Sequence, residues 1–309
     1  MFIALGFVLL IKGANVLVDG SSSLAKRYGI SDIVIGLTIV AMGTSAPELV
    51  VSVIAAIKGN SGIAIGNVMG SNIANICLVM GGAGIIMPMV IRKETVKQEI
   101  PFCFITAVLL LIVLLFFNNP FLVSRIEAIV LLASLGVYIF FMMRSAKKSS
   151  IGPIKTESLD PAAAVIMIAG GLLGLMLGGN LIVKNAVAIA EKLNVSQEMI
   201  GLTIVALGTS LPELATAIAA VLKNKPDIAV GNVVGSNIIN TGLVLGTAAV
   251  INPITSSKEF LADSLILVAA SFAIFLFMFT GKKNKLDRWE AVILLLGYFG
   301  YMAYVIGRG

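Results

Sequence analysis

The sequence contains no histidine, only two cysteines and few charged residues. Without histidine, no imidazole can serve as a metal ligand, a proton relay or a general base. Cys77 and Cys103 lie inside apolar stretches without metal-ligand spacing, so we expect both to be small buried residues. The sequence also has no nucleophile–base pair and no cofactor motif. These absences argue against an enzyme and against a zinc or copper protein.

The scarcity of charge excludes an ordinary soluble domain. Charged residues make up 12% of the 309 residues and apolar residues 58%, with a mean hydropathy of +1.04. Soluble domains carry about 25% charged residues. The net charge of +6 could indicate a nucleic-acid partner, but no basic stripe with interleaved aromatic residues is present. The composition predicts an integral membrane protein whose surroundings are the lipid bilayer.

The apolar runs predict an all-α integral membrane protein. A membrane-spanning helix needs about 20 mainly apolar residues. The first run has no basic start and continues into further apolar sequence, which favours a membrane helix over a cleaved signal. Ten runs qualify, at 1–20, 31–57, 62–88, 97–118, 122–143, 161–183, 196–222, 226–252, 259–281 and 286–307. The polar stretch between the fifth and sixth runs divides the chain into a unit at 1–143, a linker at 144–160 and a unit at 161–309.

The basic residues predict the orientation in the cell membrane. Ten spans place both termini on one side, and termini outside leave fifteen Lys and Arg residues in cytoplasmic segments and six in outer ones. The remaining basic residue, Lys12, falls within the first span. Because cytoplasmic loops carry the excess of positive charge, we expect both termini outside and the linker in the cytoplasm.

The chain repeats itself after 165 residues. GLTIVAMGTSAPE at 36–48 matches GLTIVALGTSLPE at 201–213, and GNVMGSNIAN at 66–75 matches GNVVGSNIIN at 231–240. Residues 36–82 and 201–247 share 27 identities in 47 positions without a gap. Because each unit has five spans, an odd number, the second copy must enter the membrane upside down. Inverted repeats of this kind are typical of secondary transporters, whose site lies at the repeat interface near the midplane.

The repeated segment predicts that helices 2 and 7 are broken. Pro47 and Pro212 supply no N–H, and each ring crowds the carbonyl four residues earlier. Irregular backbone at membrane depth is tolerated where it lines a cavity or is buried in protein. We expect unpaired carbonyls near Ala41 and Ala206. Hydroxyl oxygens add to these carbonyls at Thr44, Ser45, Thr209 and Ser210.

The same residues also fit a purely structural interpretation. Ser45 with Glu48, and Ser210 with Glu213, have the spacing of a capping box that closes the first turn of a helix. Capping returns about 1 kcal/mol, whereas a charged carboxylate near the bilayer centre costs about 2.5 kcal/mol or more. Capping alone therefore does not account for the two glutamates, and capping combined with cation binding remains open.

A second repeated segment supplies further oxygen atoms. Ser71 and Asn75 lie one helical turn apart, as do their equivalents Ser236 and Asn240. We expect each such face to lie opposite the Thr and Glu of the neighbouring span. Asn67 and Asn232 are expected to hydrogen-bond across helices, with direct ligation of a cation as the alternative. Carboxylate, amide, hydroxyl and carbonyl oxygens suit sodium and calcium, and the charge of −2 matches one divalent or two monovalent cations.

Together, the two repeated segments resemble the alpha repeats of the calcium/cation antiporter superfamily, and the whole chain looks most like prokaryotic sodium/calcium exchangers. The resemblance implies a secondary active antiporter that exchanges calcium for sodium by alternating access, without ATP or a cofactor. It implies that calcium is held chiefly by Glu48 and Glu213, with carbonyls at Thr44 and Thr209. It implies sodium sites drawn from Ala41, Thr44, Ser45, Glu48 and Ser71, and from Ala206, Thr209, Ser210, Glu213 and Ser236. Asn75 and Asn240 would complete the middle of the cage.

One departure and two alternatives accompany this resemblance. Several relatives carry Asp where this chain has Asn240, so the cage here holds two carboxylates rather than three, which puts potassium co-transport in doubt. A proton/calcium antiporter could use the same glutamates to bind protons. A cation channel could use the same oxygens, but it is expected to repeat a filter around a symmetric oligomer. One chain already carries two copies here, so an oligomer is not required.

Overall fold

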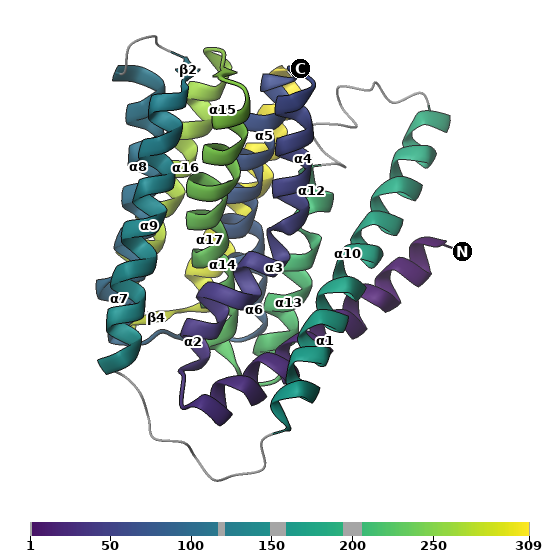
Figure 1. Ribbon diagram of the computed structural model, residues 1–309, viewed down its shortest axis with the longest axis vertical. Helices are drawn as coiled ribbons and strands as arrows, with labels where there is room; N and C mark the ends of the chain where they lie inside the picture. The colour runs from purple at the N-terminus through teal and green to yellow at the C-terminus, as the bar shows by residue number, and fades with distance from the viewer. Residues whose placement is uncertain (1, 117–120, 149–158, 194–205, 309) are drawn as a thin grey trace.

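The structure is a computed structural model and describes residues 2–116, 121–148, 159–193 and 206–308 (Figure 1). The helices of the first half are α1 (Phe2–Tyr28), α2 (Asp32–Ile35), η1 (Gly36–Val40), α3 (Ala41–Thr44), α4 (Ala46–Ile57), α5 (Ser61–Ile73), η2 (Ala74–Met80), α6 (Gly81–Ile86), α7 (Lys93–Lys97), α8 (Glu99–Phe116) and α9 (Arg125–Lys148). Those of the second half are α10 (Pro161–Lys192), α12 (Ala206–Thr209), α13 (Leu211–Leu222), α14 (Pro226–Ile239), η4 (Asn240–Leu245), α15 (Gly246–Ile251), α16 (Glu259–Phe277) and α17 (Arg288–Arg308). The all-helical prediction is confirmed, and the described residues include three π-helical turns, labelled η.

Eight helices in the described residues are long and apolar enough to cross a membrane, and a ninth span forms if the bent pair 32–44 and 46–57 is counted as one. The seventh predicted span begins in 194–205, which lies outside the described residues, and continues into α12 and α13. Ten spans therefore stay a prediction. Two continuous spans, α5–η2–α6 and α14–η4–α15, are 78% buried, against 33–44% for the other long helices. These two spans form the centre of the bundle.

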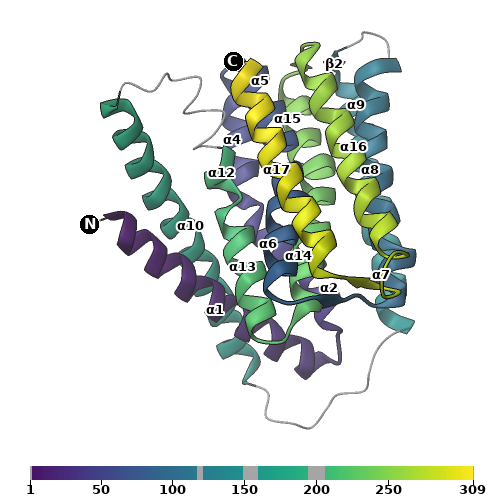
Figure 2. The ribbon, with the colours of Figure 1, turned by 180° about the vertical axis from the view of Figure 1, so that it is seen from behind.

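The helices α1 and α10 run well past the ends that the sequence predicts for them. Hydropathy predicts ends at 20 and 183, but α1 reaches Tyr28 and α10 reaches Lys192. At 1.5 Å per residue these helices measure about 40 and 48 Å, longer than the hydrocarbon core of about 30 Å. Both helices are therefore expected to tilt, and the views show them crossing obliquely beside the more upright bundle (Figures 1 and 2).

Backbone contact joins α1 to α10. A Cβ atom at Gly13 would lie 2.8 Å from both the carbonyl oxygen of Gly171 and the nitrogen of Leu175. No side chain fits at this crossing, so glycine is required for the two helices to approach so closely.

Two short antiparallel strand pairs, which the sequence does not predict, connect the halves. The strand β1 (Met89–Val90) pairs with β4 (Lys285–Leu286), and β2 (Leu122–Val123) pairs with β3 (Ile254–Thr255). Each pair takes one strand from each half. The first pair lies near the start of α17 and the second near the start of α9, at opposite ends of the bundle (Figure 2).

The last helix, α17, is anchored by an ion pair. Both terminal nitrogens of Arg308 donate to the carboxylate of Asp263 in α16, at 2.7 and 2.8 Å. The Asp263 side chain is only 2% exposed, so the guanidinium supplies the opposite charge that a buried carboxylate needs.

Candidate cation-binding site

The second span bends at Ser45, as the proline pattern predicts. The axes of 32–44 and 46–57 differ by 44°. Ser45 has φ −81° and ψ 3°, a sparsely populated backbone conformation, and Pro47 occupies the first turn of α4. Ser210 has nearly the same conformation, with φ −86° and ψ 1°. The two breaks are therefore equivalent in local geometry.

The carbonyl of Ala41 is not left unpaired by the break, contrary to the expectation from the sequence. It accepts the Ser45 N–H at 3.0 Å and the Thr44 hydroxyl at 3.4 Å. Pro47 has no N–H to offer the Gly43 carbonyl four residues earlier, and the Ser45 N–H meets that carbonyl instead. Ala41 as a ligand stays a prediction, and Ala206 begins the short helix α12.

The capping-box interpretation fails for both serines in its simple form. Neither Ser45 nor Ser210 makes a side-chain cap bond to the helix that follows it. The Ser45 hydroxyl instead donates to Oε1 of Glu213 at 3.4 Å, across the two halves of the chain. Ser45 thus lies against the carboxylate of the other repeat.

Each glutamate is held by one serine of its own half. The Ser71 hydroxyl donates to Oε1 of Glu48 at 3.5 Å, and Ser236 donates to Oε1 of Glu213 at 3.4 Å. Both carboxylates are 0% exposed. This part of the predicted pairing between neighbouring spans is confirmed.

The threonine hydroxyls, in contrast, contact polar side chains of the opposite half. The Thr44 hydroxyl donates to Oδ1 of Asn232 at 3.0 Å and lies 3.5 Å from the Ser236 hydroxyl. The equivalent Thr209 donates to Oδ1 of Asn67 at 3.3 Å and lies 3.4 Å from the Ser71 hydroxyl. From the sequence we expected each threonine to face the Ser and Asn of the neighbouring span in its own half. The expectation was wrong because a pattern along one segment does not show how two segments cross.

The asparagines Asn67 and Asn232 hydrogen-bond across helices, as expected. Besides accepting from threonine, Asn67 donates through Nδ2 to the Glu48 carbonyl at 3.2 Å and to the Ser52 hydroxyl at 2.9 Å. Ser52 was not among the residues predicted from the sequence, although it lies one turn after Glu48 on the same helix face. The second half has Ala217 at the position of Ser52, and the Asn232 Nδ2 has no partner among the described atoms.

Asn75 and Asn240 occupy equivalent positions at the start of the π-helical turns η2 and η4. Both are 0% exposed, and neither amide oxygen nor amide nitrogen of either residue has a partner among the described atoms. Isolated π-helical turns often mark functional sites, because they displace side chains from the regular helical register. Here they carry the two amides for which the family resemblance implies a place in the middle of the cage.

Unpartnered polar atoms gather where the two repeated segments meet. Buried polar groups normally have partners, so such a cluster needs an explanation. Among the described residues it includes Oε2 of Glu48, Oε2 of Glu213, Oγ of Ser210 and the amide groups of Asn75 and Asn240. Two buried carboxylates are costly without compensating positive charge. Oxygen atoms of these kinds are the ligands that sodium and calcium prefer, so the arrangement is suited to hold hard cations.

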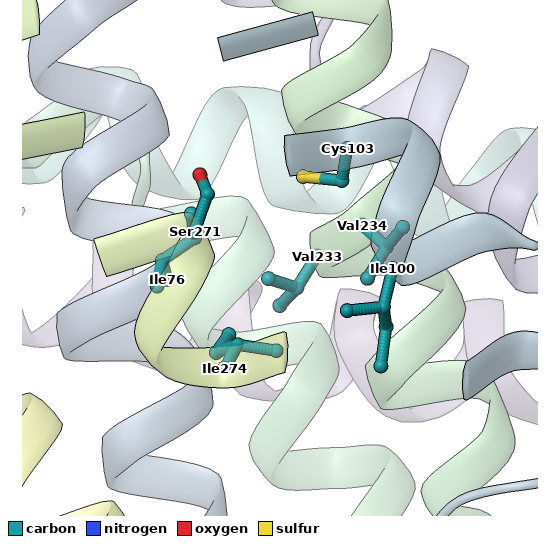
Figure 3. A pocket seen from close by; sticks show the side chains of 7 residues that line it. All are labelled: Ile76, Ile100, Cys103, Val233, Val234, Ser271 and Ile274. Atoms are coloured by element: carbon teal, nitrogen blue, oxygen red, sulfur yellow. The ribbon is translucent and has the colours of Figure 1, made fainter. Parts of the chain in front are cut away.

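A small cavity between η2, α8, α14 and α16 has a different character. It has a volume of about 10 Å³ and is lined by Ile76, Ile100, Cys103, Val233, Val234, Ser271 and Ile274. Figure 3 shows mainly aliphatic side chains, with the Cys103 thiol and the Ser271 hydroxyl as the polar groups. Such a space holds at most one water molecule and offers no carboxylate. Cys77 and Cys103 are both buried and free, as predicted.

Comparison with known proteins agrees with this geometry. A family model described as "Sodium/calcium exchanger protein" matches residues 1–144 and 163–307. The putative antiporter CaxA of Alkalimonas amylolytica is 38% identical over 311 residues, covering 97% of this chain and 96% of that protein. The sodium/calcium exchanger MaX1 of Methanosarcina acetivorans is 32% identical over 342 residues, covering 98% and 97%. A solved structure of the sodium–calcium exchanger NCX_Mj, soaked with Na⁺ and Sr²⁺, superposes with a TM-score of 0.86 at 31% identity, covering 98% of this chain and 96% of that one.

The chain belongs to the sodium/calcium exchanger family, and its fold is that of a membrane exchanger. Family membership confirms the prediction of a cation antiporter rather than an enzyme.

Proposed function

We propose that the chain moves calcium and sodium in opposite directions across the cell membrane through one site that opens alternately to the two sides. One observation carries this proposal. Two wholly buried carboxylates, Glu48 and Glu213, come from equivalent positions of a repeated segment, and hydroxyl groups from both halves surround them. A site built in this way can be exposed from either side by related movements of the two halves.

The proposal includes an inverted relation between the halves. Matched contacts support it, since each hydrogen bond of Thr44 to the second half has a counterpart from Thr209 to the first half. The strand pairs support it too, because equivalent strands β1 and β3 contribute to pairs at opposite ends. In this arrangement the chain consists of two units of five helices, 1–143 and 161–309, joined by the linker 144–160.

The proposed ligands are those that the family resemblance implies, and the contacts between the two halves are compatible with them. We assign calcium to the carboxylates of Glu48 and Glu213 and the carbonyls of Thr44 and Thr209. The hydroxyls of Ser45, Ser71, Ser210 and Ser236 would serve sodium on either side of the calcium position, with Asn75 and Asn240 in the middle. Ala41 would contribute its carbonyl by giving up the weaker 3.4 Å contact with Thr44, and Ala206 would act equivalently.

Charge gives the exchange its obligatory character. The two carboxylates carry −2 when ionised, so one calcium or two sodium ions make the site neutral. An empty site would move an uncompensated buried charge, which is costly in a low-dielectric interior. The loaded site therefore changes its exposure more readily than the empty one.

Transport driven by a sodium gradient tests the proposal. In proteoliposomes loaded with sodium and diluted into sodium-free buffer, we expect uptake of labelled calcium well above that of protein-free liposomes. A pH gradient without sodium is expected to give no such uptake. Uptake driven by the pH gradient alone would instead favour proton/calcium exchange, and single-channel currents would favour a channel.

The orientation has its own test. We place both termini outside and the linker 144–160 in the cytoplasm, since fifteen basic residues then lie inside and six outside. A membrane-impermeant maleimide is expected to label Lys58→Cys in intact cells, and Lys283→Cys only after permeabilisation; both positions are exposed. The reverse labelling pattern would invert the topology.

A further inference from the structure

Lys223 connects α1 to the end of α13 at one end of the bundle. Its Nζ lies 2.6 Å from Oδ1 of Asp19 and donates to the carbonyl of Asn15 at 3.0 Å. The two side chains are 27% and 53% exposed and line a polar cavity of about 420 Å³. The pair is thus reached by solvent, and it joins the tilted helix α1 to the helix that carries Glu213.

The opposite end of the molecule cannot form this contact. A shift of 165 residues relates Lys223 to Lys58, and it relates Asp19 to Lys184. The acid–base pair at one end therefore corresponds to two lysines at the other. Both lysines are exposed, and neither makes an ion pair within the described ranges.

Helix packing shows the same difference between the ends. The helix α1 packs along α13, whereas its counterpart α10 has no comparable packed interface with α4 within the described part of the chain. The bundle is therefore closed, by the packing of α1 against α13, at the same end that holds the Asp19–Lys223 ion pair.

We propose that the Asp19–Lys223 pair is a latch that favours the state closed at the Lys223 end, and that Lys58 and Lys184 disfavour the mirror state closed at the other end. This inference rests on the inverted-repeat transport cycle proposed above. In such a cycle the second state exchanges the contacts of the two halves, which would bring Lys58 toward Lys184. The attraction between Asp19 and Lys223 stabilises the state closed at the Lys223 end, and the repulsion between Lys58 and Lys184 destabilises the mirror state. Both effects therefore raise the population of the first state.

The expected size of this shift is modest and can be measured. Single exposed ion pairs change an equilibrium by about two- to fivefold. Spin labels at Ile57→Cys on α4 and Ile189→Cys on α10 would report closure at the Lys58 end by their distance; both positions are exposed. In labelled protein without further substitutions, we expect the long distance between the two labels, which corresponds to an open Lys58 end, to be the more populated one. Asp19→Asn and Lys184→Asp should each raise the short-distance fraction by about two- to fivefold.

A matched control separates the latch from general loss of charge. Arg92 and Asp227 form an ion pair of the same 2.6 Å length that does not involve α1 or α10. Arg92→Gln should leave the distance distribution unchanged. The exchanged pair, Asp19→Lys with Lys223→Asp, should restore the original distribution, and high concentrations of choline chloride should reduce the effect of Asp19→Asn.

The outcomes separate this inference from the proposed function. An unchanged distance distribution in both Asp19→Asn and Lys184→Asp would overturn the latch, even in protein that still exchanges sodium for calcium. Failure of the exchanged pair to restore the distribution would also overturn it, because a loss of structure alone would then explain the variants. Absence of sodium-driven calcium uptake in unmodified protein would instead overturn the proposed function.

Discussion

Replacing either buried glutamate, by Glu48→Gln or Glu213→Gln, is expected to abolish calcium transport while the protein stays folded. Glutamine keeps the volume and the acceptor oxygen that meets Ser71 or Ser236, but it removes the charge. Calcium affinity follows the number of charged ligands. Even the outer hydrogen-bond partners of metal ligands contribute about 10- to 100-fold, so loss of a carboxylate ligand should reduce sodium-driven calcium uptake by at least about 100-fold.

Folding can be judged separately from transport in these variants. A buried carboxylate without a cation is unfavourable, so its replacement by a neutral amide should keep or raise the melting temperature measured in detergent without calcium. Added calcium should raise the melting temperature of the unmodified protein, because it binds only the folded state. It should not do so in either variant. Glu94→Gln, at an exposed position in α7, is the control and should retain both transport and the calcium response.

Retained transport in both glutamine variants would contradict the proposed site. The glutamates would then serve the local structure of the two breaks, despite the absence of side-chain caps at Ser45 and Ser210. Loss of transport in only one variant would show that the halves are not equivalent. The unmatched Ser45–Glu213 bond already marks one difference between them.

The sequence predicts the membrane helices well because apolar length is a property of each segment alone. Its errors on α1 and α10 arose where those helices continue past the apolar run. Asp19 and Lys184 mark the ends of the two runs, yet the structure continues each helix by about two turns beyond them. Hydropathy locates the part of a helix that lies in lipid and says nothing about where the helix ends.

Residue types at the site were predicted from the repeat, whereas their partners were not. The doubled motif identifies Glu48, Glu213 and the hydroxyls because the same polar residues recur in apolar surroundings. The contacts of Thr44 with Asn232 and of Thr209 with Asn67 depend on how two distant segments cross, which no local period encodes. The short strand pairs were missed for the same reason, because two residues give no periodic signal.

The crossing that positions Asn232 beside Thr44 depends on Gly231, and Gly231→Leu is expected to prevent folding. A Cβ atom at this position would lie 2.7 Å from the Ile33 carbonyl oxygen and 2.9 Å from the Leu37 nitrogen. Both are backbone atoms, so the clash can be relieved only by separating α14 from the start of the second span. Overpacking by a few methylene groups lowers the stability of the folded state by about 1–3 kcal/mol where neighbouring side chains can adjust. At Gly231 the neighbours are backbone atoms that cannot adjust in this way, so we expect a larger loss.

Size-exclusion profiles of a fluorescent fusion and melting in detergent would measure this effect. Gly231→Leu should give mainly aggregated protein, while the smaller change Gly231→Ala should give folded protein with a lower melting temperature and weaker calcium uptake. Weaker uptake follows because any widening of the crossing moves Asn232 away from the Thr44 hydroxyl, 3.0 Å distant in the native packing. Gly297→Leu on α17 is the matched control, since a Cβ there meets no described atom within 4 Å. Monodisperse Gly231→Leu with an unchanged melting temperature would show that this crossing is not the close backbone contact on which the site depends.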